Sequence, residues 1–282
     1  MRLIADSGST KTMWALLDLK TSQVQQVQTS GINPFLQTEE EISSILEKEF
    51  SMKVGEDLPI YFYGAGCANP EKKDVVRRAL QRTLKSDDIY VDSDLMCAAK
   101  SLLGSSPGIA AILGTGSNSC YYDGKDIVSN VSPLGSVLGV EGSGAVIGKK
   151  LLGDILKRQL PDNVYQLFFD TYKTTPAEIL DKVYKQPFPN RYMAGFTRFI
   201  SENIQEESLN NLIKSSFSEF FIRNVRQYEQ SSELSVNFIG SIAYVFQSQL
   251  KEVAAALGYK VGVIAKDPME GLINYHLKNI EK

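Results

Sequence analysis

The chain has 282 residues, of which 43% are hydrophobic, and its 30 Lys plus Arg against 33 Asp plus Glu give a net charge of -3. This is the composition of a globular protein with one large or two medium domains, and it offers no basic field for binding nucleic acid or anionic membranes. No apolar run reaches the roughly 18–20 residues of a membrane helix, and Asp6 interrupts the start before a signal peptide could form. We therefore expect a cytoplasmic protein.

Three cysteines and one histidine narrow the chemistry that the chain can perform. Cys67, Cys97 and Cys120 lie far apart without a CxxC pair, so neither a disulfide framework nor a zinc site is expected. Cys97 and Cys120 are interpreted as core residues, and Cys67 as a residue that could line a cleft. The single His276 is predicted on a helix surface, which leaves carboxylates, glycines and hydroxyls as the reactive groups.

The first hundred or so residues alternate between strands and helices. Strands are predicted at 4–6, 13–19 and 23–29, with a turn of small residues at 7–12. A helix with apolar residues at 42, 45, 46 and 50 follows the N-cap Thr38. The order continues with a strand at 59–63, a turn at 64–66, a helix at about 70–85, a strand at 89–91, a helix at 93–103 and a linker at 104–108. The charges around Lys72, Lys73, Arg77 and Arg78 are interpreted as solvated helix faces.

The same order of elements then begins again. Predicted are strands at 109–113, 119–122 and 127–131 around the turn 114–118, a helix at 142–156, a strand at 235–240, a helix at 245–257, a strand at 261–265 and a helix at 269–280. A largely helical stretch at about 157–232 separates the first helix of this copy from its fourth strand. Residues 6–10 align with 114–118, with Gly8 over Gly116 and Ser9 over Ser117. The repeated order predicts a duplicated α/β unit.

The two turns contain residue types that suit a phosphate site. A tight turn of small residues between antiparallel strands exposes consecutive N–H groups to anionic oxygens, and Ser and Thr add hydroxyl donors. Asp6 would repel a bare phosphate, but it fits a Mg²⁺ ion, which is commonly held by one or two carboxylates with waters and phosphate oxygens. Two such turns facing each other across a cleft would hold a polyphosphate. The alternative is that both are ordinary hairpin turns.

Two further helix starts contain candidate site residues. Asp92 and Asp94 flank Ser93 where a strand runs into a helix, and we expect the two carboxylates to differ in role. Asp92 or Ser93 caps the helix, whereas Asp94 is favoured as the base that accepts a proton from an attacking hydroxyl. The glycine-rich segment 139–145 either presents its helix start to a ligand or allows close helix packing.

Together these segments resemble the acetate kinase, sugar kinase, Hsc70 and actin superfamily, in particular the branch that contains N-acetylglucosamine kinase and the BadF/BcrA-type ATPases. The resemblance spans almost the whole chain, and its motifs occur in the family's order. Residues 4–12 are similar to the first phosphate motif, 113–118 to the second, 91–94 to the connecting motif with the general base, 240–243 to the adenosine motif and 268–272 to the closing segment.

The resemblance implies a fold, a cofactor and a partner. The fold is a duplicated βββαβαβα, ribonuclease H-like and actin-like ATPase fold of two lobes. The lobes are expected at 1–106 and 107–266, with a helical insertion at about 157–232 in the second lobe and the final helix, about 267–282, packing back on the first. ATP with Mg²⁺ is the implied cofactor. The implied partner is a small-molecule sugar, with no nucleic acid and no membrane.

The family's motifs also imply roles for particular residues of this chain. The metal is assigned to Asp6 and the general base to Asp94. Phosphate and nucleotide contacts are assigned to Ser7, Gly8, Ser9, Thr10, Lys11, Gly114, Thr115, Gly116, Ser117, Asn118, Gly240 and Ser241. Sugar contacts are assigned to Asn33, Gly64, Ala65, Gly66, Asp94, Thr115, Gly135 and Glu141.

The chain departs from the family's pattern at two positions. Val140 replaces the aspartate of the family's G-D-E-G-S segment, where Glu141 could substitute for the lost acid, and Leu134 replaces a tryptophan of the animal N-acetylglucosamine kinases. The leading function is ATP-dependent phosphorylation of an amino or N-acetylamino hexose. The alternatives are a BadF-type activator of a partner redox enzyme and a catalytically impaired sugar- or nucleotide-binding protein. An apolar helix around 209–221 is either buried on one side or forms a homodimer interface.

Overall fold

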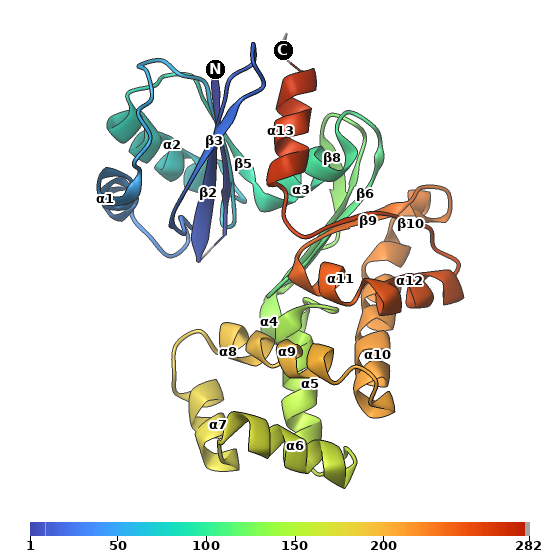
Figure 1. Cartoon of the computed structure of the whole chain (residues 1–282). Coiled ribbons are helices and arrows are strands. Elements are labelled where there is room, and N and C mark those ends of the chain that lie inside the picture. Colours follow the sequence, from blue (N-terminus) through green and yellow to red (C-terminus); the bar gives the residue numbers. More distant parts are fainter. Residues whose placement is uncertain (9, 280–282) are drawn as a thin grey trace. The chain divides into compact units, whose positions relative to one another are not determined.

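The computed structural model describes residues 1–8 and 10–279, and the chain divides into two compact units (Figure 1). The first unit combines Met1–Ser106 with Gly124–Asp126 and the chain from Pro268 onward. The second unit contains Pro107–Asp123 and Ile127–Asp267. Within the described residues, no helix is both long enough and apolar enough to cross a membrane.

The first unit is built on a five-stranded mixed sheet in the order β3-β2-β1-β4-β5. Its strands are β1 (Arg2–Ser7), β2 (Lys11–Leu17), β3 (Val24–Ser30), β4 (Ile60–Gly64) and β5 (Ile89–Ser93). The first three form an antiparallel meander, and β1, β4 and β5 run parallel. Because parallel strands end at one edge, Ser7, Gly64 and Ser93 lie next to one another in register, and the residues that follow them meet at that edge.

Helices cover both faces of this sheet, as Figure 1 shows. On one face lie α1 (Glu39–Glu49) and α2 (Pro70–Leu84), over a core that includes Trp14, Phe62 and Leu80. On the other lie α3 (Asp94–Leu103) and α13 (Met269–Lys278), which pack against each other. The predicted N-cap Thr38 is confirmed, because its side chain accepts from the Glu41 N–H and Glu41 bonds back to the Thr38 N–H.

The second unit repeats this architecture. Its sheet has the order β10-β9-β6-β7-β8, again an antiparallel meander beside parallel strands. The strands are β6 (Gly108–Leu113), β7 (Ser117–Tyr122), β8 (Ile127–Asn130), β9 (Val236–Ile239) and β10 (Val261–Ala265). The predicted duplicated α/β fold is therefore confirmed, including the helical insertion between the first helix and the fourth strand of this copy.

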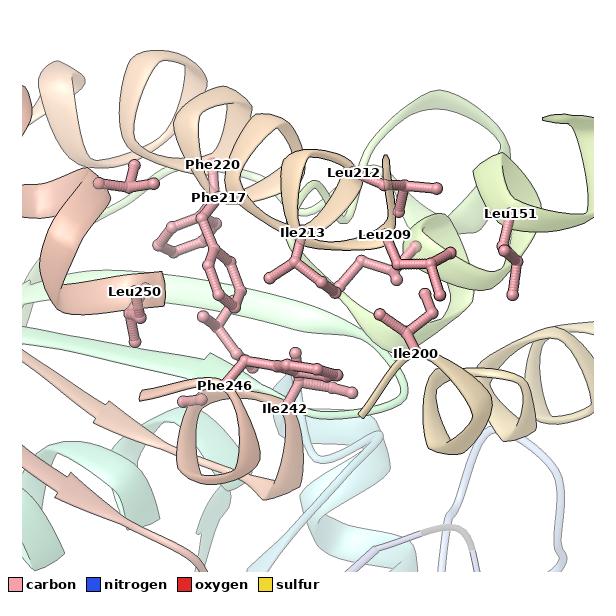
Figure 2. Packing of buried hydrophobic residues seen from close by; sticks show 14 of the residues in the cluster. Leu151, Ile200, Leu209, Leu212, Ile213, Phe217, Phe220, Ile242, Phe246 and Leu250 are labelled. Atoms are coloured by element: carbon pink, nitrogen blue, oxygen red, sulfur yellow. The ribbon is translucent and has the colours of Figure 1, made fainter. Parts of the chain in front are cut away.

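Helices make up most of the second unit. They are α4 (Gly135–Leu138), α5 (Gly144–Leu156), α6 (Asp162–Tyr172), α7 (Pro176–Tyr184), α8 (Pro189–Gly195), α9 (Thr197–Glu202), α10 (Glu207–Arg223), the short turns η1 (Val225–Gln227) and η2 (Glu229–Ser232), α11 (Ser241–Val245) and α12 (Gln247–Ala256). Figure 2 shows Ile213 and Phe217 of α10 packed with Phe246 and Leu250. The apolar face of α10 is thus buried in the core of its own unit.

Several local predictions differ from the structure. The helix predicted at 245–257 corresponds to α12, and the preceding α11, which ends at Val245, was not predicted; Phe246 separates the two with a ψ of 31° and is 2% exposed. Ser117 and Asn118 belong to β7, so the second turn is shorter than predicted. The short helix α4 was not predicted. The last helix ends at Lys278, and the predicted helical residue Ile280 lies outside the described residues.

Candidate active site

The first predicted phosphate turn joins β1 to β2. Gly8 closes it by donating its N–H to the Lys11 carbonyl at 3.0 Å, and Gly8, Thr10 and Lys11 are exposed. Ser7 is buried, and its hydroxyl lies 2.6 Å from the Thr12 hydroxyl and donates to the Ile32 carbonyl at 2.9 Å. The Ser7 side chain therefore anchors the turn, while Gly8, Thr10 and Lys11 face solvent. The predicted contact Ser9 lies outside the described residues.

Asp6 precedes this turn, partly exposed at the end of β1, and it lies close to α3. The Cys97 thiol of that helix donates to Asp6 Oδ1 at a sulfur–oxygen distance of 3.8 Å. Burial and the nearby carboxylates of Asp6 and Asp94 hold the pKa of Cys97 well above its usual value, so the thiol keeps its proton and acts as the donor. Asp94 and Cys97 are three residues apart and thus share a face of α3. The Cys97 thiol therefore bonds Asp6 and lies within electrostatic reach of Asp94.

Asp92 and Asp94 differ clearly in their surroundings. Asp92 accepts hydrogen bonds from Lys73 Nζ at 2.7 Å, from the Tyr90 hydroxyl at 2.5 Å and from the Ser93 N–H at 2.7 Å. Burial raises the pKa of Asp92, but these three hydrogen bonds outweigh it and leave the pKa below the usual value. Asp92 is therefore a fully engaged, ionised carboxylate.

Asp94 is the first residue of α3, and Ser93 is the helix cap, since its hydroxyl accepts from the Met96 N–H at 3.1 Å. Burial raises the pKa of Asp94, and the N–H groups of Leu95 and of Asp94 itself offset this only in part. A raised pKa makes a carboxylate a better proton acceptor. Of the two carboxylates, Asp94 has the properties of a general base.

The expected sugar contacts of the first unit lie beside these carboxylates. The Ala65 N–H donates to the Ser7 carbonyl at 2.8 Å, which fixes the turn 64–66 to the end of β1. Gly66 has a φ of +84°, and a Cβ there would collide with Asn33 Oδ1. That oxygen accepts from the Phe35 N–H at 3.0 Å. Only glycine fits this position, and it places Asn33 directly against the turn.

The second predicted phosphate turn lies in the other unit, against the start of α5. Gly114 donates its N–H to the Gly116 carbonyl at 2.9 Å, and the Gly114 carbonyl accepts from the Gly144 N–H at 2.8 Å. Gly240, with a φ of +119°, lies so close to the Leu113 carbonyl that a Cβ would collide with it. The adenosine-motif glycine and the second turn are therefore adjacent within this unit, with Thr115, Gly116 and Ser241 exposed.

Two residues assigned to ligand contacts make internal contacts here as well. Ser117 is 7% exposed within β7. Asn118 Oδ1 accepts from the Ser119 N–H and from Asn130 Nδ2, both at 2.9 Å. The Asn118 side chain therefore helps to hold the hairpin that carries the second turn, and Ser117 is buried in β7.

The glycine-rich segment around Val140 adopts an unusual backbone. Val140 has a φ of +54° and is 7% exposed, although a β-branched residue rarely adopts this region. Glu141 bonds Arg223 Nε at 2.7 Å and accepts from Asn224 Nδ2 at 3.3 Å, so its carboxylate is tied to the end of α10. Ser143 caps α5 by accepting from the Val146 N–H. Gly135, at a φ of +73°, is exposed.

The surroundings of two residues near the site differ from those predicted from the sequence. Lys73, interpreted as part of a solvated face, is one-third exposed and paired with Asp92. Its spacing from Val76 and Leu80, on the buried face of α2, was the available signal. His276, predicted on a helix surface, is 2% exposed and lies 3.3 Å from the Tyr63 hydroxyl, because α13 packs that face on the sheet.

The surroundings of the three cysteines do not favour thiol chemistry, and the described part of the chain contains no ready-made metal cluster. The three cysteines are free and buried, and burial raises the pKa of Cys67 to about 12. Among the described residues, no three His, Cys, Asp or Glu side chains gather to hold a metal ion. A single carboxylate such as Asp6 nevertheless suits Mg²⁺, which takes its remaining ligands from water and phosphate oxygens.

Comparison with known proteins identifies the family. No family model and no curated protein matches the chain. A solved structure from Porphyromonas gingivalis is 44% identical, with a TM-score of 0.93 over 99% of this chain and 100% of that one. One from Chromobacterium violaceum is 15% identical, with a TM-score of 0.74 over 98% and 99% of the two chains. Both carry the name "putative N-acetylglucosamine kinase".

A third structure, the ROK hexokinase from Thermus thermophilus, is 14% identical and has a TM-score of 0.53 over 98% of this chain and 96% of that one. At this identity the hexokinase and the Chromobacterium protein show a common fold. The Porphyromonas protein is 44% identical over nearly the full length, which shows membership of the same family as well as a common fold. The chain therefore belongs to the N-acetylglucosamine kinase-like branch of the acetate and sugar kinase, Hsc70 and actin superfamily.

Proposed function

We propose that the chain is an ATP-dependent sugar kinase that phosphorylates a hydroxyl of an amino or N-acetylamino hexose. The observation that carries the proposal is the placement of Asp94, whose pKa is raised, at the start of the helix whose Cys97 thiol donates to Asp6 at the carboxyl edge of the sheet. The family assignment and the two small-residue turns support it. The proposal keeps the expected lobes 1–106 and 107–266.

The reaction assigns a distinct task to each group. Asp94 accepts the proton of the attacking sugar hydroxyl as the hydroxyl oxygen bonds to the γ-phosphorus and the bond to ADP breaks. Asn33 and the turn 64–66 orient the sugar so that this hydroxyl faces Asp94, and Thr115, Gly135 and Glu141 are further candidate contacts. Most of the rate enhancement in such transfers comes from positioning and from neutralising charge.

The phosphates would contact the exposed residues of each turn, Gly8, Thr10 and Lys11 in one unit and Thr115 and Gly116 in the other. Gly240 and Ser241 would contact the nucleoside. Asp6 would hold Mg²⁺ through water or directly, and the metal, when bound, neutralises phosphate charge. An enzyme that uses ATP on a sugar is expected in the cytoplasm, which is part of the proposal.

The test is ADP release with the purified chain, ATP and Mg²⁺ across glucosamine, N-acetylglucosamine, N-acetylmuramic acid and glucose. Asp94→Asn should abolish sugar-dependent ADP release while nucleotide binding persists. Asp74→Asn is the matched control, because Asp74 is a solvent-facing carboxylate on α2, and it should behave as wild type. Full turnover by Asp94→Asn would show that another group is the base.

Val140 favours a second candidate, a sugar- or nucleotide-binding protein with impaired catalysis. An aliphatic side chain at this position can neither accept a hydrogen bond nor hold Mg²⁺ through water. Sugar binding without ADP release in the wild type, together with activity in Val140→Asp, would establish this candidate. Activity in the wild type would reject it. The BadF-type activator has less support, because Cys67, Cys97 and Cys120 are each buried in the structure.

A further inference from the structure

Lys73 and Asp92 connect two segments of the first unit that the proposed reaction needs to keep together. Lys73 lies near the start of α2, the helix that follows the turn 64–66. Asp92 lies near the end of β5, directly before Ser93 and Asp94. Their Nζ–Oδ1 distance is 2.7 Å, with side chains 33% and 15% exposed. This ion pair therefore ties the β4–α2 connection, where sugar contacts are expected, to the β5–α3 connection with the base.

Asp92 also holds the start of α3 through hydrogen bonds. Its carboxylate accepts the Ser93 N–H at 2.7 Å, and the Ser93 hydroxyl in turn caps the helix through the Met96 N–H at 3.1 Å. Asp94 is the residue between these two contacts. The position of its backbone is thus fixed by the orientation of the Asp92 carboxylate.

Tyr90 links Asp92 to a later turn of α3. Its hydroxyl donates to Asp92 and accepts from Lys100 Nζ of α3 at 3.4 Å, while Lys100 Nζ also donates to the Tyr63 hydroxyl at 3.5 Å. Lys100 lies six residues, or about 1.7 helical turns, after Asp94, which gives α3 a second attachment to β4 and β5. The helix cannot rotate or slide without breaking several of these bonds.

We propose that Lys73, Asp92 and Tyr90 are positioning residues that fix Asp94 relative to the turn 64–66. The inference rests on the proposed kinase function, in which Asp94 is the base and that turn helps to orient the sugar. None of the three residues needs to touch substrate. Their effect is to keep the acceptor oxygen of Asp94 within proton-transfer reach of the bound hydroxyl.

The pair and its matched control make the inference testable. Lys73→Met removes the only cation that contacts Asp92 in an ion pair among the described residues, and leaves that carboxylate half-buried without compensation. Because a displacement of about 1 Å can reduce turnover about 100-fold, kcat should fall by about 10- to 100-fold, with the KM for ATP nearly unchanged. Lys73→Arg keeps the ion pair and should restore most of kcat. Arg78→Met, which breaks the α2 ion pair with Glu39, should leave kcat unchanged.

Asp92→Asn supplies a second variant that keeps the shape of the side chain. It retains an acceptor for the Ser93 N–H but loses its charge, and we expect a smaller loss of kcat than in Lys73→Met. Tyr90→Phe removes one donor to Asp92, and its kcat should lie between that of wild type and those of Lys73→Met and Asp92→Asn. If Lys73→Met and Asp92→Asn both kept kcat within about twofold of an active wild type, the positioning role would be wrong although the kinase function would stand.

Hydrogen–deuterium exchange separates this inference from the proposed function. Peptides covering residues 89–97 should exchange faster in Lys73→Met than in wild type or Arg78→Met, since the helix start loses its restraint. An inactive wild type would reject the kinase proposal but leave this measurement intact. Unchanged exchange at 89–97 in Lys73→Met would overturn the network itself.

Discussion

Gly66 offers a direct test of how the first unit holds its expected sugar contact. The perturbation is Gly66→Ala, and Gly258→Ala is its control, because both glycines have similar φ values of +84° and +82°. A Cβ at Gly66 would strike Asn33, whereas a Cβ at Gly258 meets nothing within 4 Å. The control therefore carries the backbone strain alone, and the difference between the two variants isolates the displacement of Asn33.

The magnitudes follow from these contacts. A left-handed backbone costs a residue with a Cβ about 1–2 kcal/mol, which both variants share. Gly66→Ala additionally weakens the hydrogen bond between Asn33 Oδ1 and the Phe35 N–H, worth about 0.5–1.5 kcal/mol. We therefore expect Gly66→Ala to lower the free energy of unfolding by about 2–3 kcal/mol, roughly 1 kcal/mol more than the control.

Urea unfolding followed by circular dichroism measures both variants, and the fluorescence of the buried Trp14 locates the Gly66 effect in the first unit. The KM for the sugar should rise in Gly66→Ala, because Asn33 moves, and the KM for ATP should not. Equal destabilisation of the two variants together with an unchanged sugar KM would refute the reasoning.

Three further predictions use groups with defined surroundings. Burial raises the pKa of Asp94, so kcat/KM should fall as the pH decreases, with a midpoint above the ordinary aspartate pKa of 3.8. A pH–rate profile whose acid midpoint lies at or below pH 3.8 would contradict this. Burial lowers the pKa of His276 to about 3, so below about pH 6.5 the unfolded state binds a proton that the folded state does not. The free energy of unfolding should therefore decline as the pH falls below about 6.5, by up to about 1.4 kcal/mol per pH unit. In urea titrations, His276→Gln should remove this decline. Ser7→Ala removes the hydroxyl that bonds Thr12 and Ile32 and should lower the free energy of unfolding by about 1–3 kcal/mol in urea titrations; a free energy equal to that of wild type would contradict this.

The elements of the fold could be predicted where the signal is local. Thr38 indicates the start of a helix, because its capping box involves only the residue three positions later. Ser93 caps α3 through a contact that is equally close in sequence. The two copies of the fold were visible because strand and helix periodicities, and the small residues of each turn, repeat in the same order. Such signals need no knowledge of distant contacts.

The predictions that failed depend on contacts distant in sequence. His276 is buried because α13 returns to the first unit, where Arg2 donates to the carbonyls of His276 and Asn279 at 3.0 and 2.8 Å. The spacing of His276 from Met269 and Leu272 places it on the apolar face of α13, but the strands that this face packs on are distant in sequence. Lys73 was misassigned for the same reason, since its partner Asp92 is on another element. Asp94 was preferred over Asp92 from the motif, and the structure supplies the physical difference, because Asp92 is occupied by three donors.

Val140 combines a left-handed backbone with a side chain that has no hydrogen-bond acceptor. Its φ of +54° costs a β-branched residue about 1–2 kcal/mol, a conformation that aspartate and asparagine tolerate better. The Val140 N–H donates to the Pro133 carbonyl at 2.9 Å and its carbonyl accepts from the Ser143 N–H at 3.2 Å, so the segment stays closed despite the strain. Since Ser143 caps α5 and the adjacent Gly144 N–H bonds Gly114, this strained segment braces the second turn. The segment therefore contributes to the fold through its backbone hydrogen bonds to Pro133 and Gly114, and a side-chain acceptor at position 140 is not needed to hold the turn.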